Sequence, residues 1–169
     1  MKHLFEIARF LASSKLHPQD KTLFMAASLI AFYSLLRVSE YTCENPNSFS
    51  PSESLALSDI QFQNSLLFLR IKASKTDPFK QGVTVRIPTI KSVLCPVKAL
   101  HLYLVYRGSS LGPLFHFHDG SLLTRNHIQW LLKQTPSKLN ISTHSFRIGG
   151  ATAAAAAGIP DSTIQTLGI

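Results

Sequence analysis

His144 and Arg147 stand three positions apart in the segment His-Ser-Phe-Arg-Ile-Gly-Gly, which covers residues 144–150. Residues with this spacing lie on one face of an α-helix. An imidazole and a guanidinium held side by side can both donate hydrogen bonds to a phosphate, the guanidinium in a bidentate manner. The simpler alternative is a histidine that caps a helix, followed by a surface arginine. The pair alone does not decide between these two interpretations.

Arg37 and Lys75 are two further candidates for phosphate chemistry. Arg37 follows a strongly apolar stretch, where an unpaired charge is unfavourable, so an ion pair with Glu40 is the structural alternative. Lys75 lies in the turn or flank between two predicted strands, where a lysine can reach a phosphate or protonate a leaving oxygen. Lys72, Lys80 and Arg125 are candidates for less specific contacts with a nucleic-acid backbone.

The sequence gives little support for a metal site, a disulfide framework or another common type of catalytic motif. His116 and His118 alternate on a short segment, but no third and fourth ligand has a spacing suited to zinc. Cys43 and Cys95 are too few for a disulfide framework and are expected to be buried thiols. A glycine-rich phosphate loop, a nucleophile elbow and paired carboxylates are absent from the sequence. We therefore expect neither a metal nor a cofactor.

The composition favours a polyanionic partner. The chain of 169 residues carries 17 Lys and Arg against 9 Asp and Glu, a net charge of +8, and 45% of its residues are hydrophobic. Nucleic acid is the first expectation for such a balance, and an anionic membrane surface the second. The longest apolar stretch, 23–36, is shorter than the roughly 20 residues of a membrane span. We expect an intracellular, soluble protein.

Apolar periodicity predicts the elements that position these residues. Helices are expected at 2–13, 19–33, 37–41, 96–106, 124–134, 144–157 and 161–167, and strands at about 60–63, 67–71 and 83–87. The strands alternate as a hairpin with a third neighbour would. The prediction is a single α+β domain, mostly α-helical, with a small three-stranded antiparallel sheet.

The order of the candidate residues is more specific than any one of them. An arginine in Leu-Arg-Val-Ser-Glu at 36–40, a lysine in the following hairpin and His-x-x-Arg at 144–147 together resemble the catalytic domain of tyrosine recombinases, the phage integrase family. Within that family, the chain most resembles the recombinases of DIRS-like and Crypton mobile elements of eukaryotes. Segments 74–82, 112–115 and 158–168 support the resemblance, which covers residues 1–168.

The resemblance implies a chemistry and a role for each residue. In the family a tyrosine attacks a DNA phosphate to give a 3′-phosphotyrosine, without metal or cofactor. Arg37 matches the first arginine and Arg147 the second, and His144 matches the motif histidine; these three stabilise charge in the transition state. Lys75 matches the hairpin lysine that protonates the leaving 5′-oxygen. The implied partner is double-stranded DNA, bound in the nucleus, with several copies of the chain assembling on it.

The chain departs from the family pattern at two points. Ser34 stands where the family often has glycine in the turn before Arg37. The nucleophilic tyrosine is expected about ten residues beyond segment 158–168, whereas the four tyrosines, at 33, 41, 103 and 106, all precede His144. We therefore expect residues 1–169 to form one catalytic-type domain that lacks the tyrosine-bearing helix and the N-terminal core-binding domain. Such a domain is catalytically incomplete, although some family members accept the tyrosine from a neighbouring subunit.

Three functional hypotheses remain open at this point. The first is a truncated recombinase domain that binds DNA phosphates. The second is a non-catalytic DNA-binding or protein-interaction module that reuses the fold. The third is a basic structural domain without a nucleic-acid function.

Overall fold

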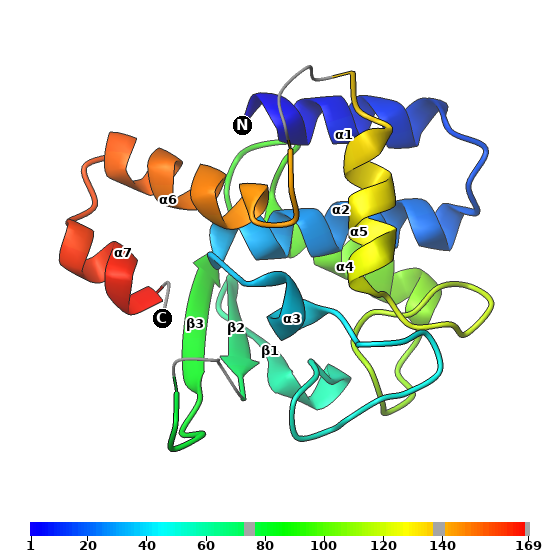
Figure 1. Ribbon diagram of the computed structural model, residues 1–169, viewed down its shortest axis with the longest axis horizontal. Helices are drawn as coiled ribbons and strands as arrows, with labels where there is room; N and C mark the ends of the chain where they lie inside the picture. The colour runs from blue at the N-terminus through cyan, green and yellow to red at the C-terminus, as the bar shows by residue number, and fades with distance from the viewer. Residues whose placement is uncertain (73–76, 137–140, 168–169) are drawn as a thin grey trace.

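The computed structural model describes residues 1–72, 77–136 and 141–167. The described helices are α1 (Lys2–Ser13), α2 (Pro18–Tyr33), α3 (Val38–Tyr41), α4 (Pro96–Arg107), α5 (Arg125–Lys133), α6 (Ser145–Ala156) and α7 (Asp161–Leu167), with a short 3₁₀ helix η1 (Leu57–Asp59). The strands are β1 (Ile60–Gln63), β2 (Leu66–Ile71) and β3 (Val83–Pro88). Figure 1 shows helices gathered around α2, with the sheet at the end where α2 leads into α3.

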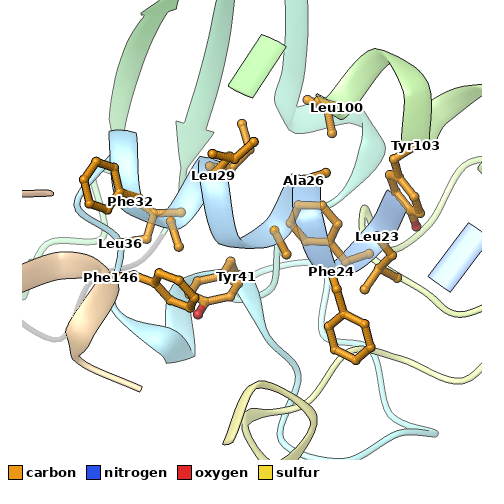
Figure 2. Close-up of a cluster of buried hydrophobic side chains, with 14 of the residues drawn as sticks. Leu23, Phe24, Ala26, Leu29, Phe32, Leu36, Tyr41, Leu100, Tyr103 and Phe146 are labelled. Atoms are coloured by element: carbon orange, nitrogen blue, oxygen red, sulfur yellow. The ribbon is translucent and has the colours of Figure 1, made fainter. Parts of the chain in front are cut away.

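Helix α2 is the centre of the fold. It is apolar around most of its circumference, as expected for a helix covered on all sides. Helices α1, α4 and α6 all pack against it. Figure 2 shows Leu29 and Phe32 of α2 in one core, with Leu100 of α4 and Phe146 of α6. The position of α6, and therefore of Arg147, is set by its contact with α2.

The three strands form one antiparallel sheet in the order β1–β2–β3. Asn64 and Ser65 make the turn between β1 and β2, and both have positive φ, 49° and 63°. Positive φ at both central residues defines the hairpin turn whose twist matches that of the strands. Leu67 and Leu69 of β2 are buried, which anchors the sheet to the core. The connection from β2 to β3 contains Lys75.

Most predicted elements are confirmed, including the α+β fold with a three-stranded sheet. Helix η1 was not predicted, because a single 3₁₀ turn has no apolar period. Cys43 and Cys95 are buried free thiols, as expected. Among the described residues, no helix has both the length and the apolar character needed to cross a bilayer.

Candidate phosphate-binding site

Arg37 is placed by a tight turn at the end of α2. The N–H of Leu36 donates to the carbonyl oxygen of Ala31 at 3.0 Å, which is the long hydrogen bond of a Schellman-type helix end. Leu35 has φ +55°, whereas Ser34 has φ −101°. The left-handed residue of this turn is therefore Leu35 and not Ser34, and the match of Ser34 to a family glycine stays a prediction. A side chain in this conformation costs about 1–2 kcal/mol, which burial of Leu35 offsets.

Glu40 holds Arg37 at the start of α3. Its Oε2 accepts the backbone N–H of Arg37 at 2.7 Å, and its Oε1 lies 3.7 Å from the Arg37 Nη1. Glu40 is buried, and the side chain of Arg37 is about a quarter exposed (24%). The ion pair considered from the sequence is thus confirmed. It is compatible with a functional role, because the guanidinium still reaches the surface.

Two glycines let α6 approach α2 closely. A Cβ atom at Gly150 would lie 2.1 Å from the carbonyl oxygen of Phe32 and 2.6 Å from the Leu35 side chain. A Cβ atom at Gly149 would meet only the edge of the Phe32 ring, at 3.2 Å. Phe146 is buried in the core beside Leu36, as Figure 2 shows. This packing fixes the helix turn that carries Arg147.

Arg147 is the residue whose surroundings point most clearly to a ligand. Its Nη1 is buried and makes no hydrogen bond with any described residue. Burial lowers the pKa of the Arg147 guanidinium, the positive charge of Arg37 lowers it further, and the carboxylate of Glu40 raises it. The guanidinium of Arg147 therefore lies within the electrostatic influence of the Arg37–Glu40 ion pair. The unused donor of Arg147, close to a second guanidinium, makes a site suited to an oxyanion.

His144 is the N-cap of α6 and its side chain is exposed. The turn is held by Ser142, whose Oγ accepts the backbone N–H of His144 at 3.3 Å, while the N–H of Ser142 donates to the Oγ of Ser145 at 2.9 Å. Among the described residues, no hydrogen bond joins the His144 ring to Arg147. The histidine thus lies at the start of the helix that carries Arg147, and its imidazole is exposed.

The predicted hairpin lysine, Lys75, lies outside the described residues. The connection that follows it is ordered by Asp77, whose carboxylate accepts the N–H of Gly82 at 2.7 Å. This hydrogen bond lowers the pKa of the Asp77 carboxyl. Lys80 is exposed in the same connection, with φ +49°. Lys80 is therefore accessible to a polyanion.

Lys72 has a structural partner that the sequence did not suggest. Its Nζ lies 2.8 Å from the Oδ2 of Asp59 and also donates to the carbonyl oxygen of Pro51. Asp59 in turn accepts the N–H of Ala56 at 2.8 Å. Lys72 thus ties β2 to the loop before η1. A contact of its side chain with DNA stays a prediction.

Arg125 opens α5 and is exposed. It lines a hollow of about 420 Å³ between α3, the loop at 42–54 and the first turn of α5. Ser39, two residues after Arg37, lines the same hollow, together with Glu44 and Glu53. Arg125 therefore lies in a hollow lined by hydroxyl and carboxylate groups, and its contact with DNA also stays a prediction.

The four tyrosines differ in how accessible their hydroxyl groups are. Tyr103 is fully buried and its hydroxyl donates to the carbonyl oxygens of Leu114 or His116, and burial raises its pKa to about 12. Burial also raises the pKa values of Tyr33 and Tyr41, whose hydroxyl oxygens are covered. Tyr106, on α4, is exposed. A nucleophile has to be both reachable and readily deprotonated, and Tyr33, Tyr41 and Tyr103 do not meet these conditions.

The roles of Leu35 and Gly150 in assembling this site are not evident from the sequence. No sequence pattern marks a leucine as left-handed, since the conformation is rare for any residue with a side chain. Small residues such as Gly149 and Gly150 permit close helix packing, but the sequence does not show which residue of α2 they meet. Glu40 was identified only as an ion-pair partner.

Comparison with known proteins gives a match in structure but not in sequence. No family model and no curated protein matches the chain. The site-specific recombinase XerH, bound to its difH substrate before cleavage, superposes with a TM-score of 0.65 at 14% identity, over 97% of this chain and 44% of XerH. A Flp recombinase–Holliday junction complex gives a TM-score of 0.61 at 12% identity, over 96% of this chain and 42% of Flp.

The fold is therefore that of the tyrosine recombinase catalytic domain, which confirms the predicted fold class. Among the structures that share it is also XerH on palindromic difH after cleavage, with a TM-score of 0.62 at 13% identity. The chain spans less than half the length of the recombinases it matches.

Proposed function

We propose that this chain is a tyrosine-recombinase-type domain that binds double-stranded DNA and serves DNA recombination or integration. Arg37 and Arg147 hold one DNA phosphate between them, and His144 and Lys75 complete the contact when DNA is bound. The observation that carries the proposal is the buried, unused Nη1 of Arg147 beside a second guanidinium. A phosphate oxygen supplies the missing acceptor for this Nη1.

Three further observations support DNA as the source of this phosphate. The net charge is +8, and Lys80 and Arg125 are exposed basic residues. The solved structures that share the fold are complexes with DNA substrates or Holliday junctions. The motif order of Arg37, Lys75, His144 and Arg147 supports the mobile-element type of recombinase, and with it a nuclear protein that assembles in several copies on DNA.

We further propose that residues 1–169 alone do not cleave DNA. The family order places the nucleophile after the second arginine, and every tyrosine of this sequence precedes His144. The alternative is a module that uses the same phosphate site only for binding. Addition in trans of a segment that supplies a tyrosine distinguishes the two, because only a cleavage-competent site then forms a covalent protein–DNA adduct.

DNA binding is tested by fluorescence anisotropy with a labelled duplex over a series of salt concentrations. Affinity should fall linearly with salt on logarithmic axes, since phosphate contacts release counterions. Arg147→Ala should weaken binding by about tenfold to a hundredfold, the value of a charge-assisted hydrogen bond. Arg147→Lys tests geometry at constant charge, because a lysine cannot make the bidentate contact.

Lys91 is exposed and provides the matched control. Lys91→Ala removes the same charge from another surface and should change the affinity much less than Arg147→Ala. Equal effects of the two substitutions would show that binding is diffuse and that no phosphate site is assembled. A nicked suicide duplex should give no covalent adduct with the chain alone; an adduct that Tyr106→Phe removes would assign the nucleophile to Tyr106 and refute catalytic incompleteness.

A further inference from the structure

Three side chains with metal-binding groups meet at the start of α2, at the opposite end of this helix from Arg37. His17 is the N-cap of α2 and Asp20 lies in its first turn. His118 comes from the segment between α4 and α5. One donor atom from each residue can be chosen such that all three lie within 4.8 Å of one another.

Asp20 organises the cluster. Its Oδ1 accepts the backbone N–H of His118 at 2.9 Å, and its Oδ2 lies 2.7 Å from the Nδ1 of the same residue. The imidazole rings of His17 and His118 stack with centroids 4.1 Å apart and planes inclined by 12°. Asp20 is buried, whereas both rings are exposed. The carboxylate is therefore fixed, and the imidazoles can be reached from solvent.

We propose that His17, Asp20 and His118 form a binding site for a divalent transition-metal ion of the zinc class. Two imidazole nitrogens and one carboxylate oxygen are ligands that Zn²⁺ favours, and a fourth position is left for water or an external ligand. The site is built from residues far apart in the sequence, since 98 positions separate Asp20 from His118.

The donor atoms of the three residues lie close to the positions that a tetrahedral zinc ion requires, but their distances have to change slightly. Donor atoms around a tetrahedral zinc ion are about 3.3 Å apart, given metal–ligand distances of about 2.0–2.1 Å. The Asp20–His118 pair therefore opens slightly from 2.7 Å as the ion takes the place of the shared proton. His17, whose Nδ1 accepts the N–H of Gln19 at 3.2 Å, turns its exposed ring toward the ion. Both changes leave the backbone in place.

The proposal departs from the expectation of no metal. From the sequence, His116 and His118 were the two candidate zinc ligands, and no third or fourth ligand was identified. In the structure the His116 ring contacts the carbonyl oxygen of Phe117 and is not part of the cluster. The missing ligands, His17 and Asp20, come from α2, and only the packing of the 113–123 segment on that helix reveals them.

The metal site is distinct from the phosphate site. Helix α2 has 16 residues, so its two ends are about 24 Å apart. A bound ion would join the first turn of α2 to the segment that leads into α5. The expected consequence is a more stable α2–α5 region, independent of whether the chain binds DNA.

Titration calorimetry with ZnCl₂ tests the proposal, on the whole chain after treatment with a chelator and its removal. One ion should bind per chain, and Zn²⁺ at a hundred times its Kd should raise the Tm by about 5–10 °C. A Co²⁺ titration should give d–d absorption without a thiolate charge-transfer band, which separates this site from Cys43 and Cys95. Absence of one-to-one binding overturns the proposal.

Two variants remove ligands while keeping the local structure. His17→Asn retains a side chain that can cap α2, and His118→Phe retains a ring for the stack; each should weaken Zn²⁺ binding by at least tenfold. His116→Ala is the matched control and should bind as the wild type does. Circular dichroism checks that each variant is folded. Unchanged affinity in both His17→Asn and His118→Phe, or a thiolate band with Co²⁺, places the metal elsewhere and refutes the site.

Discussion

The close contact between α6 and α2 makes Gly150→Ala the most informative substitution in this protein. The new Cβ atom would lie 2.1 Å from the carbonyl oxygen of Phe32, and ordinary contact begins at 3.4 Å. Helix α6 therefore has to move away by about 1.3 Å, the difference between these distances. The obstacle is backbone in the central helix, which cannot turn aside as a side chain can. Arg147, one turn earlier on α6, is displaced with the helix.

Two opposing terms set the size of the effect on stability. Overpacking of this kind costs about 1–3 kcal/mol, and alanine regains about 1 kcal/mol over glycine in helix propensity. We expect Gly150→Ala to lower the free energy of unfolding by up to about 2 kcal/mol, the difference between these terms. DNA affinity should fall by about tenfold or more, because Arg147 no longer meets the same phosphate as Arg37.

Gly149→Ala is the matched control, since its Cβ atom meets only the edge of the Phe32 ring at 3.2 Å. Urea unfolding followed by circular dichroism, and anisotropy with a labelled duplex, measure the two effects. Gly149→Ala should be neutral or slightly stabilising and should bind DNA normally. If Gly150→Ala is as stable as the wild type and binds DNA equally well, the argument that α2 packing positions Arg147 is refuted.

Three further predictions concern the turn, the ion pair and the helix cap. Leu35→Gly should be about 1 kcal/mol more stable than Leu35→Ala, because glycine adopts φ +55° without strain and both lose the same buried side chain; the reverse order in urea unfolding would contradict a strained turn. Glu40→Ala should destabilise by about 1–3 kcal/mol by leaving the Arg37 N–H without its acceptor, and Glu40→Gln by less, because its amide oxygen can still accept; equal losses in thermal melts would argue against this role. The N–H of Thr124 donates to the Nδ1 of His127, which requires a neutral ring, and burial lowers the pKa of His127. The unfolded ring has its ordinary pKa near 6.5 and takes up a proton first, so this contribution to stability is complete above about pH 6.5 and declines as the pH falls toward the lower folded pKa. His127→Asn should flatten that decline in urea unfolding between pH 7.5 and 5, and an unchanged slope would count against it.

Much of the fold was predictable from the sequence because local patterns determine the elements. The apolar period of α1 and the alternation around the Asn64-Ser65 turn specify a helix and a hairpin without reference to other parts of the chain. The candidate residues Arg37 and Arg147 were also identified in this way, from residue type and order. Their charges and spacing are properties of the sequence, and so is the net charge of +8.

What the sequence could not provide is which residues meet across the core. The close approach of Gly150 to the carbonyl oxygen of Phe32 depends on how α6 packs against α2. The left-handed conformation of Leu35 belongs to the same contact region. The partner of Lys72 and the gathering of His17 and Asp20 with His118 depend in the same way on loops packing against distant elements. Side-chain chemistry and local periodicity follow directly from the sequence. Long-range contacts form only when the buried faces of the elements pack together. Residue types and their order identify the groups that could bind a phosphate, whereas the packing of α6 on α2 buries the Nη1 of Arg147 without an acceptor near the ion pair of Arg37 and Glu40.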